Sequence, residues 1–276
     1  MPTIALPYQL TKTLACALYE MQSISKVDPL YLPDTTINSK YGNFPTEIPS
    51  APPKIAFFGI GVNGFKNLDD RNLAAPFIPS AKNLDLFAPI PFRIVPVGND
   101  LTPTERANYR MRVLKTIGGA AYWCYYLKKL TFISNRVNII QTDLTTGIET
   151  IMSDLDPLDL TPTPMNTSDE GTVETQSKVS VALTAGISIT GLEVLESVNV
   201  LFNGNLLKSV VSEIGVYTGN DQVVTMSDGA GGTFNGNESI FTSLAYHYCA
   251  LGTSFSTPNK VENISLRINS ANAFLV

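Results

Sequence analysis

The sequence predicts a mainly β protein of the α+β class, with two β-rich lobes, an N-terminal helix and an extended proline-rich arm. Runs of alternating β-branched and aromatic residues, separated by turn-forming glycine and asparagine, recur along the chain. One long helical period stands near the N-terminus, and prolines crowd the segment after it. We therefore divide the 276 residues into helix and arm (1–53), first lobe (54–152), acidic and proline-containing linker (153–178) and second lobe (179–276).

The N-terminal helix and arm are predicted to contact neighbouring proteins. Residues 4–24 carry apolar side chains at steps of three or four, which mark one helix face. Residues 26–53 hold six prolines and predict an extended arm, which is unusual inside a compact domain. The candidate interface comprises Leu10, Leu14, Leu18, Met21, Tyr31, Tyr41 and Phe44.

A glycine motif follows the first strand of the first lobe. The apolar run 55–58 predicts a buried strand, and Gly59, Gly61 and Gly64 then spell GxGxxG. This pattern is typical of dinucleotide binding when a helix begins directly after it. Residues 65–79 contain prolines and polar residues that exclude one amphipathic helix. We interpret the glycines as a turn of a β protein.

The rest of the first lobe is predicted as strands around one short helical turn. Residues 85–96 indicate a proline-punctuated edge strand, and 102–105 form a capping box with proline at the first helical position. Residues 109–114 and 122–133 flank Gly118-Gly119 and predict a hairpin. Aromatic residues on both sides of its second arm indicate that both faces are covered. A helix through this arm remains an alternative.

The linker and second lobe complete the chain. Residues 153–177 are acidic and proline-rich, and lack the glycine and terminal glutamate of a calcium loop, which favours a solvated linker. Asn203-Gly204 between apolar runs predicts a hairpin over 198–211 with a type I′ turn. Further strands are predicted at 179–189, 213–217, 239–249 and 261–268, with a flexible glycine-rich tip at 228–237.

Residues for catalysis and metal binding are sparse. His247 is the single histidine, whereas serine and cysteine nucleophiles usually need a histidine base. A zinc site from Cys16, Cys124, His247 and Cys249 would require distant segments to converge. We expect no catalytic, cofactor-binding or metal-binding residue, a structural histidine, and three reduced, buried cysteines. Paired carboxylates for sugar hydrolysis stay open, because their spacing is set in three dimensions.

Composition indicates a covered surface. Charged residues make up 16% of the chain, against about 25% in soluble domains, and interface centres are depleted of charge. The net charge of −5 and the absence of a basic stripe argue against a nucleic-acid partner. No apolar run of about 20 residues and no signal-peptide pattern occurs, so we expect neither a membrane partner nor secretion, and a cytosolic protein.

Several blocks resemble the virion structural proteins of tailed bacteriophages, and more loosely the baseplate-wedge proteins of contractile tails. These blocks are KIAFFGIG at 54–61, LFAPIPFR at 86–93, YRMR at 109–112, YYLK at 125–128 and SEIGVYTG at 212–219. The resemblance covers roughly residues 50–135 and 179–249. It implies a two-lobed subunit in several symmetric copies, made in the host cytoplasm and located in the virion, with tail, baseplate or neck proteins as partners. No binding residue carries over.

Two other classes of function stay open. A carbohydrate- or receptor-binding β module of the virion would expose tryptophan and tyrosine in a groove, but Trp123, the single tryptophan, is expected to be buried. An enzyme of nucleotide or sugar type would depend on the glycine motif or on a carboxylate pair.

Overall fold

The computed structural model describes residues 8–25, 36–42, 52–68, 73–133, 138–143, 145–152 and 177–271. The chain is mainly β, as predicted, and its sheets are antiparallel. It divides into two compact units. Unit 1 comprises Met1–Leu130 and Ser188–Glu262, and unit 2 comprises Thr131–Ile187 and Asn263–Val276.

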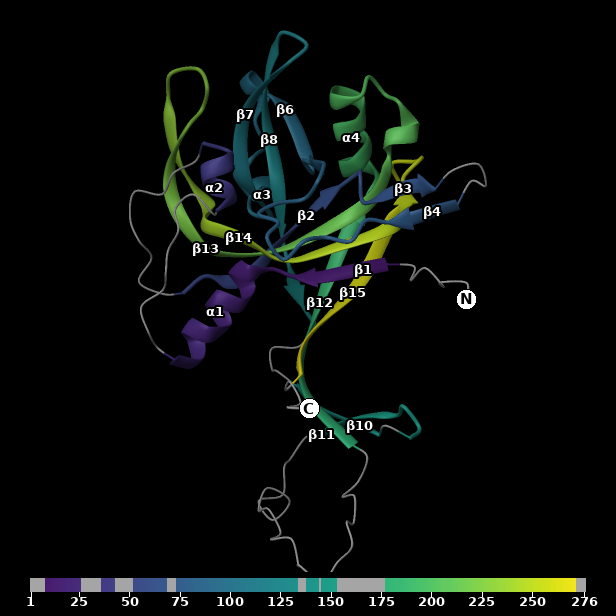
Figure 1. Ribbon diagram of the computed structural model, residues 1–276. Helices are drawn as coiled ribbons and strands as arrows, with labels where there is room; N and C mark the ends of the chain where they lie inside the picture. Colours follow the sequence, from purple (N-terminus) through teal and green to yellow (C-terminus); the bar gives the residue numbers. More distant parts are fainter. Residues whose placement is uncertain are drawn as a thin grey trace, which may run out of the picture. The chain divides into compact units, whose positions relative to one another are not determined.

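An eight-stranded sheet frames unit 1 (Figure 1). Neighbouring strands follow the order β1-β14-β13-β2-β8-β6, with β5 paired to β2 and β7 to β8. The predicted lobes 54–152 and 179–276 therefore contribute strands to the same sheet rather than to separate domains. The bounds are β1 Tyr8–Lys12, β2 Lys54–Gly61, β5 Pro89–Ile90, β6 Arg93–Pro96, β7 Tyr109–Ile117, β8 Ala120–Lys129, β13 Val210–Ser227 and β14 Thr233–Ser254.

Most predictions for the first lobe are confirmed. β7 and β8 form the expected hairpin, and both turn glycines, Gly118 and Gly119, have positive φ. The short helix α3 (Pro103–Arg106) has the predicted capping box. β6 ends the path of strands, as expected of a proline-bounded edge. It is preceded by β5 and followed by a 3₁₀ turn, η2, at Val97–Asn99.

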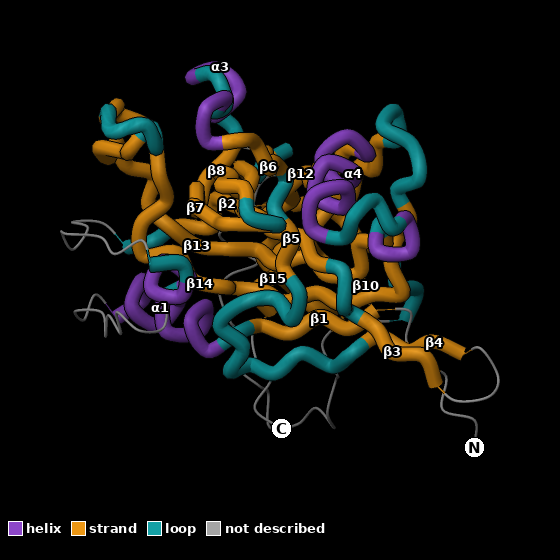
Figure 2. The backbone as a smooth tube through the Cα atoms, turned by 90° about the horizontal axis from the view of Figure 1, so that it is seen from above, coloured by secondary structure: helices purple, strands orange, loops and turns teal. Residues whose placement is uncertain are grey.

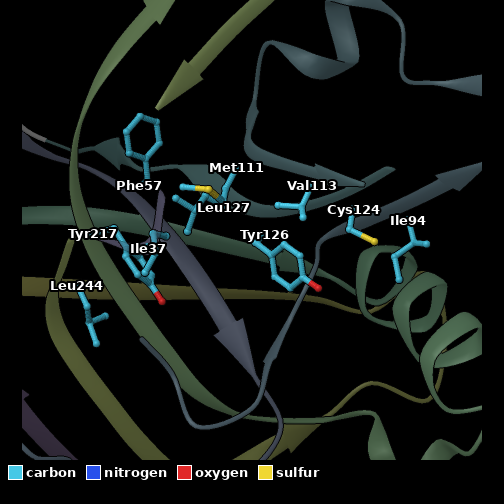
Figure 3. Packing of buried hydrophobic residues seen from close by; sticks show 10 residues of the cluster. All are labelled: Ile37, Phe57, Ile94, Met111, Val113, Cys124, Tyr126, Leu127, Tyr217 and Leu244. Atoms are coloured by element: carbon cyan, nitrogen blue, oxygen red, sulfur yellow. The ribbon is translucent and has the colours of Figure 1, made fainter. Parts of the chain in front are cut away.

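Both faces of β8 are covered, as its double-sided aromatic pattern predicted. Cys124 and Tyr126 belong to one buried cluster, whereas Trp123 and Tyr125 belong to a second. The short helix α2 (Ile37–Lys40) also contributes to the first cluster, so this part of the expected arm lies in the core. The buried members of the first cluster are Ile37, Phe57, Ile94, Met111, Val113, Cys124, Tyr126, Leu127, Tyr217 and Leu244 (Figure 3).

The N-terminal helix begins later than predicted. Residues Tyr8–Lys12 form the edge strand β1, paired antiparallel with β14, and α1 runs over Leu14–Ser25. The Thr13 hydroxyl accepts a hydrogen bond from the Cys16 amide and starts the helix. Side chains in Tyr8–Lys12 alternate between more and less exposed, as in an edge strand. Pairing with the edge of β14 favours the strand over the helix that the apolar spacing predicted. Residues 1–7 lie outside the described part.

The predicted hairpin over 198–211 is wrong: its first arm belongs to the helix α4 (Gly191–Leu201), and of its second arm only Val210 and Val211 lie in a strand. Thr190 and Glu193 form a capping box, and buried positions recur at helical spacing along α4. Asn203 and Gly204 have positive φ, as a type I′ turn requires, but they terminate the helix instead. The 3₁₀ turn η3 (Leu206–Lys208) then leads to β13.

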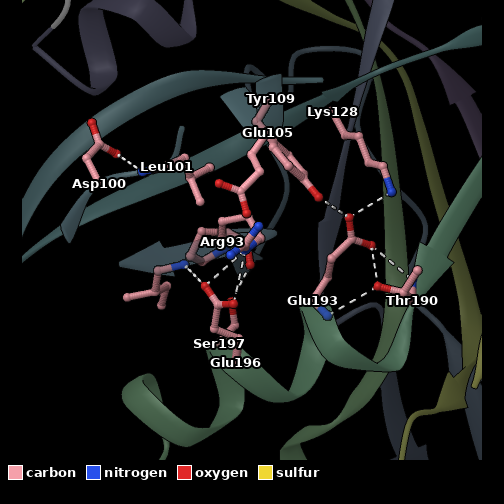
Figure 4. Close-up of polar contacts among 12 residues, drawn as sticks. Arg93, Asp100, Leu101, Glu105, Tyr109, Lys128, Thr190, Glu193, Glu196 and Ser197 are labelled. Atoms are coloured by element: carbon pink, nitrogen blue, oxygen red, sulfur yellow. Dashed lines mark hydrogen bonds and ion pairs between the residues drawn. The ribbon is translucent and has the colours of Figure 1, made fainter. Parts of the chain in front are cut away.

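Carboxylates hold α4 against the sheet (Figure 4). Glu193 accepts hydrogen bonds from the Tyr109 hydroxyl and the Lys128 ammonium, both at 2.7 Å. Glu196 pairs with the Arg93 guanidinium at 3.0 Å and accepts the backbone amide of Ile94 at 2.6 Å. Helix α4, of which only the last turn was predicted to be a strand, is thus held on the sheet by polar contacts of its own side chains.

The glycine-rich tip is shorter than predicted. Strand β14 already begins at Thr233 and pairs with β13 up to Ser227. Asp228 organises the connecting turn, because its carboxylate accepts the amides of Ala230 and Gly232, each at 2.8 Å.

Unit 2 contains a five-stranded sheet with the order β11-β10-β12-β15, and β9 pairs with β12. The strands predicted at 179–189 and 261–268 are confirmed as parts of β12 and β15. Of the predicted linker, residues 153–176 lie outside the described part. The bounds are β9 Thr131–Phe132, β10 Asn138–Asp143, β11 Glu149–Met152, β12 Ser177–Thr190 and β15 Val261–Ala271.

Unit 1 also contains a separate two-stranded sheet, in which β3 (Phe65–Leu68) pairs with β4 (Leu73–Pro76).

Candidate functional site

The outer side of α1 is apolar and exposed. Helix α1 lies beside β14 (Figure 2). Its inner side packs on β14 through the buried Cys16 and through Tyr19, whose hydroxyl lies 3.4 Å from that of Ser243. The outer side chains recur at helical spacing and are between 40% and 79% exposed. They are Leu14, Leu18, Met21 and Ile24.

Strand β1 continues this apolar surface. Leu10 is exposed and lies opposite Tyr248 of β14, so the two side chains share a sheet face. Tyr246 lies on that same face, two residues along the strand, and its side chain lies close to Cys16 of α1. Leu10 and α1 therefore occupy one side of the sheet. We call Tyr8, Leu10, Leu14, Leu18, Met21 and Ile24 the β1–α1 surface.

The predicted interface residues divide into three groups. The four from the helical pattern, Leu10, Leu14, Leu18 and Met21, are exposed together on the β1–α1 surface. Tyr41 instead packs into the core, because its ring stacks on Tyr126 with centroids 4.7 Å apart and its hydroxyl lies 3.3 Å from the Asp85 carboxylate. Tyr31 and Phe44 lie outside the described residues.

A second region is a polar cluster inside the sheet, formed by Glu213, His247 and Cys249, which we call the Glu213 cluster. Glu213 of β13 pairs directly with Cys249 of β14, and His247 stands two residues away on the same face. The His247 Nε2 atom lies 3.1 Å from Glu213 Oε2 and 3.6 Å from Cys249 Sγ. All three residues have 0% exposure.

The carboxylate of Glu213 is compensated by backbone donors. It accepts the amides of Asn63 at 3.0 Å, Phe87 at 2.7 Å and Ala88 at 3.1 Å. A buried charge is tolerated only when such hydrogen bonds replace water. Glu213 thereby joins β13 to the residues after β2 and to the loop before β5.

The glycine motif makes room for this cluster. A Cβ atom on Gly61 would lie 2.8 Å from the Ala88 carbonyl oxygen and 3.0 Å from Glu213 Oε1. A Cβ atom on Gly64 would lie 2.1 Å from the Ser212 carbonyl oxygen. The interpretation of the motif as a turn is wrong for its first two glycines, because Gly59 and Gly61 lie within β2. Glycine is needed at 61 and 64 because Glu213 and Ser212, two neighbouring residues of β13, lie too close for a side chain.

The Glu213 cluster does not have the arrangement of a nucleophilic triad. In such triads the nucleophile and the orienting carboxylate bind different imidazole nitrogens, whereas Nε2 of His247 faces both groups. The other nitrogen, Nδ1, lies 3.1 Å from the Asn83 amide. Burial, together with the charge of Glu213, raises the pKa of the Cys249 thiol to about 12, which disfavours the thiolate. His247 is buried, and both of its ring nitrogens have polar neighbours; its structural role stays a prediction.

A pocket of about 330 Å³ lies in unit 1 between the hairpin β7–β8 and strand β13. Its lining includes Tyr41, Leu114 and Trp123. The Arg112 guanidinium stacks 3.3 Å from the Trp123 ring centroid, and Trp123 is buried as predicted. The indole face toward Arg112 is therefore covered and is closed to a sugar ring.

Together these features define a mainly β protein with a buried, hydrogen-bonded Glu213 cluster inside and an apolar helix face outside. The chain matches the family of unknown function DUF7208 over residues 4–271, and it belongs to that family. No curated protein and no solved structure matches it significantly. Among the described residues, no helix is both long enough and apolar enough to span a bilayer.

Proposed function

We propose that this protein is a structural subunit of a bacteriophage virion, in the tail, baseplate or neck, and acts through protein–protein contacts in a symmetric assembly. The β1–α1 surface is the observation that carries the proposal. The phage assignment itself rests on the resemblance of the strand blocks at 54–61, 86–93 and 212–219 to virion structural proteins.

The energetics of the β1–α1 surface favour a covered state. A helix on the outside of a domain ordinarily turns its apolar stripe inward, but α1 buries the small Cys16 and leaves Leu14, Leu18 and Met21 outside. Removing apolar area from water contributes about 25 cal/mol per Å². Large exposed apolar patches mark interaction sites on soluble proteins. A partner protein that covers them gains this free energy.

The buried polar side chains of the Glu213 cluster support the same proposal. The polar side chains of the Glu213 cluster are bonded to one another and to backbone amides. They hold strands together, which suits a subunit that must stay rigid while it carries load between neighbours.

The alternative is a carbohydrate- or receptor-binding module of the virion. The pocket beside Trp123 is the feature that would serve it. The Arg112 guanidinium over the indole leaves less aromatic surface for stacking than sugar-binding sites use, which favours the structural role.

The test uses the double variant Leu18→Gln/Met21→Gln, because glutamine keeps helix propensity while removing the apolar contact. The variant is supplied in place of the native chain during production of particles, and its copy number is measured in purified particles. We expect a folded protein whose incorporation falls at least tenfold. Ser23→Gln, at an exposed polar position of the same helix, is the matched control and should incorporate normally. Normal incorporation of the double variant would refute the proposal.

A further inference from the structure

We infer that the Glu213 cluster is a binding site for a divalent transition metal of the zinc class. Its three side chains offer one oxygen, one nitrogen and one sulfur ligand, and these atoms all lie within 4.8 Å of one another. Mixed nitrogen, sulfur and oxygen ligands suit zinc or cobalt rather than magnesium or calcium.

The separations of the ligand atoms match a tetrahedral ion. With a Zn–N bond of about 2.0 Å and a Zn–S bond of about 2.3 Å, tetrahedral angles place nitrogen and sulfur about 3.5 Å apart, and nitrogen and oxygen about 3.3 Å apart. The observed distances are 3.6 Å from His247 Nε2 to Cys249 Sγ and 3.1 Å from Nε2 to Glu213 Oε2. The two distances from His247 Nε2 thus suit a tetrahedral ion, and the ligand atoms of Glu213 and Cys249 lie within 4.8 Å of each other.

The surroundings resemble the outer shell of a metal site, in which ligating carboxylates and imidazoles are themselves hydrogen-bonded. Glu213 Oε2 accepts one backbone amide, that of Phe87, which leaves its second lone pair for the ion. His247 Nδ1 faces the side-chain amide of Asn83. Phe87 also covers the imidazole, with ring centroids 4.9 Å apart, and excludes water from that side.

Binding requires a defined movement of protons. The ion replaces the proton on His247 Nε2 and the thiol proton of Cys249. The imidazole stays neutral, because its proton moves to Nδ1 and is donated to the Asn83 carbonyl oxygen after that amide turns over. One proton, that of the thiol, is released to solvent for each ion bound. Three protein ligands leave a fourth position for water.

The bound ion would link the loop before β5 to strands β13 and β14. Glu213 already bonds to Phe87 and Ala88, and the ion links that carboxylate to two residues of β14. Binding to the folded state alone raises stability by mass action.

The experiment loads the full metal-free chain with Co²⁺ alone and records the thiolate-to-cobalt absorption band, the bound metal and the released protons. We expect one ion and about one proton per chain, and a rise in melting temperature. A wild-type chain without the band or with substoichiometric metal overturns the inference, whatever the variants do.

The matched pair of variants is Cys249→Ala and Cys124→Ala, since both cysteines are buried and free. Cys249→Ala should lose the band and weaken Co²⁺ binding at least tenfold, while Cys124→Ala keeps both. A band that survives in Cys249→Ala, or vanishes in a folded Cys124→Ala, also overturns the inference. These readouts use the isolated chain and are independent of particle assembly.

Discussion

The β1–α1 surface and the Glu213 cluster both adjoin β14, and both depart from the rule that apolar side chains are buried and polar ones exposed. The first exposes apolar side chains, and the second buries polar ones. Within the sheet, the polar side chain of Glu213 is fully buried, but backbone amides donate hydrogen bonds to it. At the sheet's edge, Leu18 and Met21 are apolar and exposed, and no hydrogen bond can compensate that exposure. The comparison teaches that the side chains of the Glu213 cluster find hydrogen-bond partners within the chain, whereas the apolar side chains of the β1–α1 surface remain exposed.

The buried side of this comparison recurs elsewhere in unit 1. Glu238 has 2% exposure and accepts the amides of Met111, Arg112 and Ser239 at 2.6–3.0 Å. Met111 has a positive φ of 56°, so the carboxylate stabilises an uncommon backbone conformation. Burial raises the pKa of Glu238 even though three amides and Arg110 act in the opposite direction. Carboxylates thus take the place of strand partners where the sheet is irregular.

The largest effect on stability is expected for Gly64→Ala. The new Cβ atom would lie 2.1 Å from a backbone oxygen of Ser212, which cannot move without displacing β13. We expect a loss of about 3 kcal/mol or more in the free energy of unfolding, measured by urea denaturation. Gly98→Ala, where nothing lies within 4 Å of the new atom, is the control and should change stability little. Equal effects for both would show that the motif has no steric role.

Glu213→Gln is expected to have the next largest effect. The amide that replaces one carboxylate oxygen presents N–H groups to backbone donors and leaves buried groups unsatisfied. We expect a loss of about 2 kcal/mol, measured by the same denaturation. A loss below about 0.5 kcal/mol, which is typical of surface substitutions, would contradict the assigned role of Glu213.

Asp221→Asn should reduce stability by about 1 kcal/mol at neutral pH, because Asp221 pairs with the buried Arg110 at 2.6 Å and with Lys129 at 2.8 Å. Partial burial acts to raise the pKa of Asp221, but these two cations outweigh it and the pKa is lowered. The stabilisation is therefore present above the unfolded-state pKa of about 3.9 and is lost as the pH falls through the folded value.

The check is the stability difference between wild type and Asp221→Asn as a function of pH. It should shrink as the pH drops below about 4. A difference that stays constant down to the acid transition would mean that the ion pair does not contribute.

The smallest effect is expected for Leu18→Gln/Met21→Gln, whose stability should stay within about 0.5 kcal/mol of wild type. Both side chains are exposed and contribute little to the isolated fold. Thermal denaturation checks this, with Ser23→Gln beside it. A loss above about 2 kcal/mol would place these residues in the chain's own core and remove the contrast between the two regions.

Elements that a few consecutive residues determine were predicted correctly from the sequence. The hairpin β7–β8 and the capping box at Thr102 were both predictable, because a glycine pair and a Thr-Pro-x-Glu motif determine them locally. Helix α4 was missed because the Asn203-Gly204 signal was favoured over a second capping box, Thr190 with Glu193. That motif was visible in the sequence.

The Glu213 cluster was harder to predict because it depends on register. His247 and Cys249 stand two apart in a strand, so alternation alone places them on one face. That Glu213 lies opposite Cys249 follows only from the pairing of β13 with β14. The role of Gly61 likewise needs the neighbouring β13 and the loop at Ala88. Exposure of Leu18 and Met21 was predicted through their helical spacing.

The most direct test of the central claim is quantitative mass spectrometry of purified particles from the genome that encodes this chain. A virion subunit joined to neighbours through the β1–α1 surface should be present at a fixed copy number relative to the other particle proteins, and should remain after washing with high salt. A chain that is abundant in the infected cell but absent from the particles would contradict the account.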